Sequence, residues 1–141
     1  MARILSIDYG AKRTGVAVTD TLQIIANSLA TVATSELMKF LTDYFLKEQV
    51  ETVVVGLPKQ TDGKLSENAS RVNAFVRKFK EKFPQITVVM HDERFTTVLA
   101  HQAIISGGVK KSARRDKTLA DRVSAVIILQ SYLEQTKYNK L

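Results

Sequence analysis

The chain has 141 residues, 45% hydrophobic and 25% charged, and these ordinary globular proportions exclude a disordered chain and predict one domain around one core. It contains no cysteine and two histidines, which excludes a disulfide framework, a zinc–thiolate site and a cysteine nucleophile, and disfavours a histidine-based metal cage. The formal net charge of +7 favours polyanionic partners, although solvated lysines alone also produce such an excess.

No apolar run approaches the roughly 20 residues that span a bilayer. The N-terminus enters a predicted strand directly, without the pattern of a signal peptide. We therefore expect a cytoplasmic protein that does not interact with membranes.

Residues 4–20 contain two runs rich in Ile, Leu and Val that flank a short break, which predicts a β-hairpin. Asp8 ends the first run, which is so apolar that both faces of its strand should be covered. A buried carboxylate without compensation costs several kcal/mol, so Asp8 needs a hydrogen-bond donor, a cation or a metal as its partner. The alternative is a local role, in which Asp8 caps the turn through the backbone amides of residues 9–11.

Downstream of the hairpin, periodicity and turn residues predict a third antiparallel strand and then alternating helices and strands. Right-handed crossovers place the strand over residues 52–55 beside the first strand and the strand over 86–90 outside it, so the Asp8 strand is central. The predicted fold is an α/β sheet with helices on both faces. In chain order the elements after the hairpin are a strand over 24–33, a helix capped by Thr34 or Ser35 and ending near Gln49, a strand over 52–55, a loop over 59–65, a helix from Ser66 to Pro84, a strand over 86–90, a helix over 96–106, a basic linker over 109–117 and a helix from about 118 to 135.

Three acidic positions converge on one edge of this predicted sheet. Asp8 and the pair Asp92-Glu93 follow strands whose carboxyl ends meet at that edge. Asp121 shares a helical face with Ser124 and Ala125, small residues that let a helix approach the sheet closely. Taken alone, Asp121 has the alternative roles of stabilising the helix dipole or pairing with the neighbouring arginine.

Carboxylates this close raise each other's pKa unless a multivalent cation holds them. Oxygen ligands without His or Cys suit a hard, octahedral cation, so the sequence predicts Mg²⁺ or Mn²⁺. Such sites serve phosphoryl chemistry, in which the metal activates water and stabilises the leaving oxygen. His91 ends a strand beside these acids, and we interpret it as a structural histidine rather than a general base.

Basic residues surround the same edge and are interpreted as contacts to a nucleic-acid backbone. Aromatic residues fall mostly at core-facing helical positions, so we expect binding through phosphates and shape rather than base stacking. The candidate phosphate contacts are Lys12, Arg13, Lys59, Arg94, Lys110, Lys111, Arg114, Arg115 and Lys117.

Five motifs occur in order along the chain: Ile7-Asp8-Tyr9-Gly10 with Lys12-Arg13 and Gly15, Val55-Gly56-Leu57-Pro58, Asp62-Gly63, Asp92-Glu93-Arg94-Phe95-Thr96-Thr97, and Asp121 leading into Ala125–Leu129. Each motif is weak alone, but the ordered set resembles the YqgF family of small bacterial proteins with the ribonuclease H-like fold. Members are described as Holliday junction resolvases and as nucleases that process the 5′ end of pre-16S rRNA. The resemblance covers essentially the whole chain, which we treat as one nuclease domain, residues 1–141.

The resemblance implies a metal-dependent nuclease in which Asp8, Glu93 and Asp121 are the metal ligands and catalytic acids. Asp92 and Glu93 are neighbours, and only one of them is expected to reach the metal. The favoured substrate is precursor 16S rRNA, with the ribosome as a further candidate partner. The alternative is a resolvase of branched DNA, which requires a homodimer with two active sites, whereas the RNA nuclease could be a monomer or a homodimer. A non-catalytic RNA- or ribosome-binding module is the rival hypothesis of another class.

Overall fold

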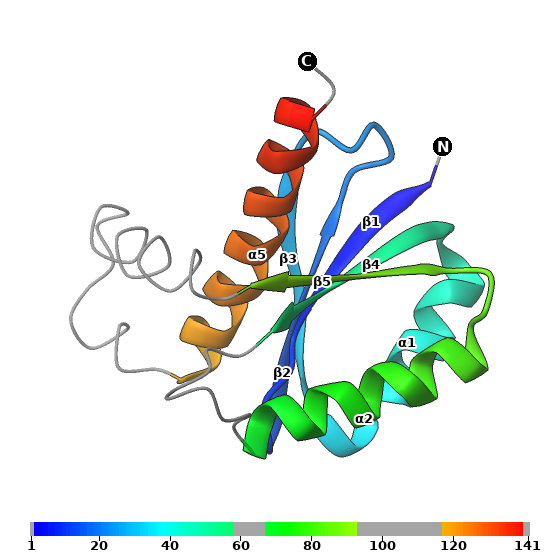
Figure 1. Cartoon of the computed structure of the whole chain (residues 1–141), viewed down its shortest axis with the longest axis vertical. Coiled ribbons are helices and arrows are strands. Elements are labelled where there is room, and N and C mark those ends of the chain that lie inside the picture. Colours follow the sequence, from blue (N-terminus) through cyan, green and yellow to red (C-terminus); the bar gives the residue numbers. More distant parts are fainter. Residues whose placement is uncertain (1, 58–66, 93–116, 140–141) are drawn as a thin grey trace.

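The computed structural model describes residues 2–57, 67–92 and 117–139 of the chain (Figure 1). These residues form a five-stranded sheet with helices packed against it. The predicted helix over residues 96–106 and the basic linker before residue 117 lie outside the described residues. In chain order the elements are β1 (Arg3–Asp8), β2 (Arg13–Thr19), β3 (Ala26–Ala33), the 3-10 helix η1 (Thr34–Glu36), α1 (Leu37–Lys47), β4 (Val50–Leu57), α2 (Glu67–Lys82), β5 (Thr87–Asp92) and α5 (Lys117–Asn139).

The strands lie in the order β3-β2-β1-β4-β5, so β1, which ends at Asp8, is the central strand. β1 pairs antiparallel with β2, and β2 pairs antiparallel with β3. β4 lies parallel to β1 on its other side, and β5 lies parallel to β4. The mixed sheet predicted from the sequence, an antiparallel meander extended by two parallel strands, is therefore confirmed.

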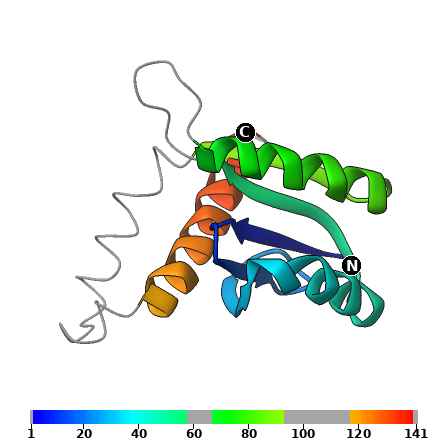
Figure 2. The same ribbon diagram turned by 90° about the horizontal axis from the view of Figure 1, so that it is seen from below.

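Helices cover both faces of the sheet, with α1 and α2 on one face and α5 on the other (Figure 2). The alternation of side chains along β1 follows these two layers. Leu5 and Ile7 are fully buried in the core beneath α1 and α2, whereas Ile4 is buried in the core beneath α5. By the same alternation, Asp8 lies on the α5 side of β1 and Tyr9 on the side of α1 and α2.

The α1–α2 side of the core is built largely from aromatic rings. The predicted apolar face of α2 is buried, and the ring of Phe79 lies 4.9 Å from that of Phe83. Phe45 of α1 packs edge-on against Phe83 at 5.0 Å, which joins the two helices. Burying a phenylalanine side chain stabilises a fold by about 1.5–3 kcal/mol, so this cluster fixes α2 firmly on the sheet.

Several predicted boundaries differ from the structure. The strand predicted over residues 52–55 is longer and runs over Val50–Leu57 as β4, and the strand predicted over 86–90 is β5, which ends at Asp92. The third strand begins at Ala26 rather than at residue 24, because residues 20–25 form the loop between β2 and β3. Neither Thr34 nor Ser35 caps α1; both lie in η1, and the N-cap of α1 is Glu36, which makes no side-chain capping bond. The last helix extends to Asn139, beyond the predicted end. Among the described residues, no helix combines the length and the apolar character that crossing a membrane requires.

Candidate active site

Asp8 lies at the carboxyl edge of the sheet, where three neighbouring strands end. It is the last residue of β1, pairs with Gly15 of β2 and is half-buried. On the other side of β1, β4 ends at Leu57, which pairs with Asp92, the last residue of β5. The predicted convergence of these strand ends is confirmed, and it makes this edge the natural place for a ligand in a sheet of this kind.

A buried hydrogen bond joins β1 directly to α5. The Ser6 hydroxyl donates to the backbone carbonyl of Ala125 at 2.6 Å, and both residues are fully buried. A contact this short between a strand side chain and helix backbone requires the close approach that small residues on α5 permit. The prediction that α5 lies close to the sheet at Ala125 is therefore confirmed.

The Ser6–Ala125 bond also fixes where position 121 of α5 lies relative to the end of β1. β1 begins and α5 ends at the same end of the molecule, so the two elements run in opposite directions (Figure 1). Asp8 lies two residues beyond Ser6, about 6.6 Å along a strand. Position 121 lies four residues before Ala125, about 6 Å along a helix. The backbone of α5 therefore brings position 121 level with the end of β1.

The turn that follows Asp8 is held by Thr34. The Thr34 hydroxyl donates to the carbonyl of Gly10 at 2.6 Å, and its backbone amide donates to the carbonyl of Lys12 at 3.0 Å. The Thr34 hydroxyl also lies 2.9 Å from that of Thr14, which is buried. These bonds tie the β1–β2 turn to η1 and limit the movement of the chain next to Asp8.

Some predicted site residues lie outside the described part of the chain. Glu93 directly follows the last residue of β5 and is one of them, as are six of the predicted phosphate contacts. Among the described residues, no three His, Asp or Glu side chains form a group that could hold a metal, and Glu93 and the side chain of Asp121 are not among those described. The six contacts are Lys59, Arg94, Lys110, Lys111, Arg114 and Arg115.

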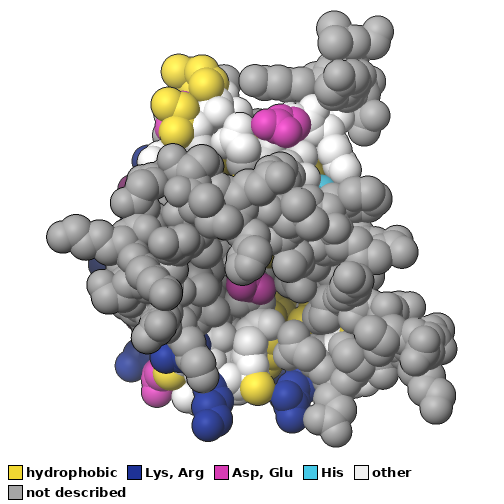
Figure 3. Space-filling view, turned by 90° about the vertical axis from the view of Figure 1, so that its left-hand side faces the viewer, with side chains coloured by type: hydrophobic (Ala, Val, Ile, Leu, Met, Phe, Trp, Pro, Cys, Tyr) yellow, Lys and Arg dark blue, Asp and Glu magenta, His cyan; other side chains and the backbone are white. Residues whose placement is uncertain are grey.

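The other three predicted phosphate contacts lie in described elements. Lys12 and Arg13 are exposed at the turn after Asp8, and Lys117 is the first residue of α5. Figure 3 looks onto this side of the molecule and shows an acidic side chain near the centre, with basic side chains along the lower border. Lys12 and Arg13 follow Asp8 by four and five residues, so the turn after this carboxylate carries two positive charges.

His91 is buried, with 4% of its surface exposed, and its Nε2 lies 2.9 Å from the hydroxyl of Ser131 on α5. The prediction of a structural histidine agrees with this environment, since the bond links β5 to α5. Ser6, Ser131 and Thr34 were not predicted from the sequence as positioning residues. A signal existed for two of them: Ser6 interrupts an apolar strand, and Ser131 interrupts the apolar stretch of the last helix.

With this geometry established, comparison with known proteins identifies the family. The family model described as "RuvX: Holliday junction resolvase" matches residues 2–135. The chain belongs to the RuvX family. RuvX is the family also called YqgF, so the family predicted from the ordered motifs is confirmed.

Relatives in the RuvX family match along nearly the whole chain. A protein of Phocaeicola vulgatus is 57% identical over 98% of this chain and 99% of its own length. One from Parabacteroides distasonis is 56% identical with the same coverage. Both relatives are named "Putative pre-16S rRNA nuclease".

Solved structures confirm the fold. RuvC of T. thermophilus, in complex with a Holliday junction substrate, superposes with a TM-score of 0.58 at 15% identity and covers 96% of both chains. The yeast mitochondrial Holliday junction resolvase Ydc2 gives a TM-score of 0.61 at 10% identity, over 99% of this chain and 80% of Ydc2. The RuvX chain therefore has the ribonuclease H-like fold that the sequence predicted.

Proposed function

We propose that this RuvX protein is a nuclease that processes the 5′ end of precursor 16S rRNA in the cytoplasm and depends on a divalent metal. The observation that carries the proposal is the position of Asp8, at the carboxyl end of the central strand and level with position 121 of α5. The names of relatives more than 50% identical to this chain supply the reaction and the substrate.

The proposed metal ligands are Asp8, Glu93 and Asp121. The chemistry of this donor set fits Mg²⁺ or Mn²⁺, which prefer carboxylate and water oxygen. Asp8 is half-buried at the end of the central strand, so its carboxylate is placed to serve as one of these ligands. When bound, the metal would activate water and stabilise the leaving oxygen of the phosphodiester. The contribution of the chain is to hold these carboxylates in place, through the Ser6–Ala125 bond on one side of Asp8 and the Thr34 bonds after it.

Basic residues around the edge are proposed to hold the RNA backbone. Lys12 and Arg13 are exposed at the turn after Asp8, so a phosphate bound there lies beside the proposed metal ligands. Charge contacts of this kind position the substrate without selecting a base sequence. Lys59, Arg94, Lys110, Lys111, Arg114, Arg115 and Lys117 are proposed to extend the same surface.

A second candidate function is resolution of four-way DNA junctions. The family description and the titles of the two structural neighbours support it. Cutting a junction symmetrically requires two coupled active sites, so this function predicts a homodimer. The RNA nuclease requires only one site in each molecule.

The test compares cleavage of a precursor 16S rRNA fragment and of a four-way DNA junction by the wild type and by Asp8→Asn, with Mg²⁺ or with a chelator. Loss of a partner that only supports a metal ligand costs up to about a hundredfold in activity, so loss of a proposed ligand should cost at least as much. Asp43→Asn is the control, because Asp43 is an exposed acid on α1, on the opposite face of the sheet from α5.

The proposed function expects RNA cleavage that requires the metal, is abolished by Asp8→Asn and is unchanged in Asp43→Asn. Cleavage of the junction alone, by a protein that is dimeric in solution, would establish the resolvase instead. If the protein binds RNA but cleaves neither substrate, it is a binding module and the proposed nuclease is wrong.

A further inference from the structure

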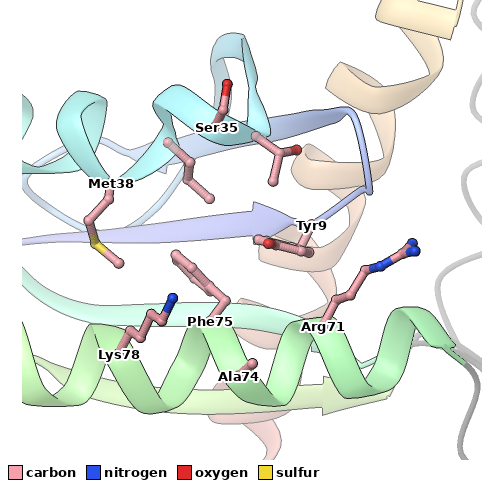
Figure 4. Close-up of a pocket in the computed structure, with 9 residues that line it drawn as sticks. Tyr9, Ser35, Met38, Arg71, Ala74, Phe75 and Lys78 are labelled. Atoms are coloured by element: carbon pink, nitrogen blue, oxygen red, sulfur yellow. The ribbon is translucent and has the colours of Figure 1, made fainter.

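A pocket of about 260 Å³ lies on the opposite side of β1 from Asp8, between α1, α2 and the end of β1 (Figure 4). Tyr9, the residue directly after Asp8, forms part of its wall. Consecutive Cα atoms are 3.8 Å apart, so the pocket opens within one residue of the proposed active site. Its lining consists of Tyr9, Thr34, Ser35, Leu37, Met38, Arg71, Ala74, Phe75 and Lys78.

The interior of the pocket is suited to a flat, apolar group. The rings of Tyr9 and Phe75 lie 5.1 Å apart with their planes inclined by 31°. Met38 of α1 lies across from Phe75, and its thioether is a polarisable partner for aromatic rings (Figure 4). Two aromatic rings and a methionine offer stacking and dispersion contacts that do not depend on the pattern of donors and acceptors on the ligand.

The rim of the pocket is positively charged. Arg71 and Lys78 both belong to α2 and are exposed, two helical turns apart. Arg71 extends past Tyr9, and Lys78 projects from α2 toward α1 (Figure 4). A ligand whose flat apolar part enters the pocket therefore meets a cation on either side, which favours a ligand that also bears negative charge.

We infer that this pocket binds one unpaired nucleobase of single-stranded RNA, with the adjoining phosphates held by Arg71 and Lys78. A volume slightly below the usual range for drug-sized ligands suits a single base. Stacking of unpaired bases on aromatic side chains is a general means of recognising single-stranded RNA. This inference rests on the proposed function, which identifies the bound polymer as RNA. It adds that the protein binds one unpaired base of that RNA.

The position of the pocket next to Asp8 indicates how binding of the base would assist cleavage. Asp8 and Tyr9 lie on opposite faces of β1, so a strand that crosses the end of β1 can present a phosphate to one face and a base to the other. Holding the base would fix the phosphodiester beside Asp8. Tyr9 and Phe75 line both the core and the pocket, so the proposal adds base stacking to the binding through phosphates and shape that the sequence favoured.

The test measures RNA binding in a chelating buffer, so cleavage plays no part and failure of the nuclease would not affect the result. Ala74→Leu fills the pocket without a change of charge, and leucine is a good helix former. Asn73→Leu is its control on the adjacent exposed position, which does not line the pocket. Lys78→Glu is compared with Lys80→Glu, another exposed lysine of α2 that does not line the pocket.

Each variant is titrated with a short single-stranded RNA and with a duplex of the same sequence, whose bases are paired and cannot enter the pocket. We expect Ala74→Leu to weaken binding of the single strand by about fivefold or more, the loss of one stacked base, and to leave duplex binding unchanged. Lys78→Glu should weaken binding of the single strand more than Lys80→Glu does. Equal losses for the two RNAs, or no loss in Ala74→Leu, would overturn the inference.

A second measurement does not depend on the variants. RNA containing 4-thiouridine is irradiated on the wild-type protein, and the crosslinked peptides are identified by mass spectrometry. The inference expects crosslinks to the peptides that contain Tyr9 or Phe75. Crosslinks confined to other peptides would contradict it.

Discussion

Gly10 sets the shape of the turn that follows Asp8. A Cβ atom at this position would overlap the backbone carbonyl oxygen of Arg13, so any larger residue must displace the turn. Forcing extra atoms into a well-packed place costs about 1–3 kcal/mol, and we expect Gly10→Ala to lower the free energy of unfolding by that amount. Because the displaced chain directly follows Asp8, cleavage should fall more than RNA affinity does. Denaturant titration, cleavage and binding assays measure these three quantities.

Ala11→Ser is the matched control for this prediction. Ala11 is the next residue in the same turn, but it is exposed, so a hydroxyl there meets solvent. Surface substitutions of this kind usually change stability by less than about 0.5 kcal/mol. Equal losses in the two variants would show that the turn is merely sensitive to substitution and that the overlap at Gly10 is not the cause.

Among the helices, α5 is the element whose placement matters most for the proposed site, because it contains Asp121. Ser6→Ala removes the hydroxyl that bonds to the Ala125 carbonyl and should cost about 0.5–1.5 kcal/mol. Ser6→Val removes the same bond and also places a methyl group against the helix backbone, which adds about 1–3 kcal/mol of overpacking. We therefore expect both variants to be destabilised, but only Ser6→Val to lose metal-dependent cleavage, because it moves α5.

Thermal unfolding and cleavage rates of the two variants check this order. Ser28→Val is the control, since Ser28 is exposed on the edge strand β3 and valine suits a strand. A Ser6→Val protein that cleaves at the wild-type rate would contradict the role given to α5.

The elements themselves were largely predictable from the sequence, whereas the contacts that position them were not. Apolar runs and helical periodicity indicated the central Asp8 strand and the apolar face of α2, because burial of apolar surface decides both. Thr34 was assigned to a helix cap because threonine commonly caps helices, but its hydroxyl is satisfied by Gly10, 24 residues earlier in the chain. A tertiary bond of this kind leaves no local pattern, so it could not have been predicted from one sequence.

In the candidate site, too, the sequence predicted individual residues but not their arrangement in space. Asp8 could be singled out because a carboxylate at the end of an apolar run needs a partner. The level of Asp121 relative to Asp8 required the Ser6–Ala125 bond, which depends on how α5 crosses the sheet. The pocket beside Tyr9 was not predicted at all, because it arises between two helices that are distant in sequence.

The carboxyl and amino edges of the sheet differ in how their charged residues are arranged. The proposed site, with Lys12 and Arg13, occupies the carboxyl edge. At the amino edge, Arg3 forms an ion pair with Glu48 at 3.3 Å, and Lys47 ends α1 nearby. The net charge of +7 attracts nucleic acid to the protein as a whole, but direct phosphate contacts are proposed only at the carboxyl edge and at the pocket beside it, where Arg71 and Lys78 lie.

This difference predicts how binding depends on salt. A lysine that contacts a phosphate releases a counterion, so its removal lowers the slope of log affinity against log salt concentration by about 1. We expect Lys12→Gln to lower this slope for single-stranded RNA and Lys47→Gln to leave it unchanged, although both variants lose one positive charge. Affinity titrations at several salt concentrations supply the slopes. If the two variants lowered the slope equally, the attraction would come from net charge alone, and the RNA path along the carboxyl edge would be wrong.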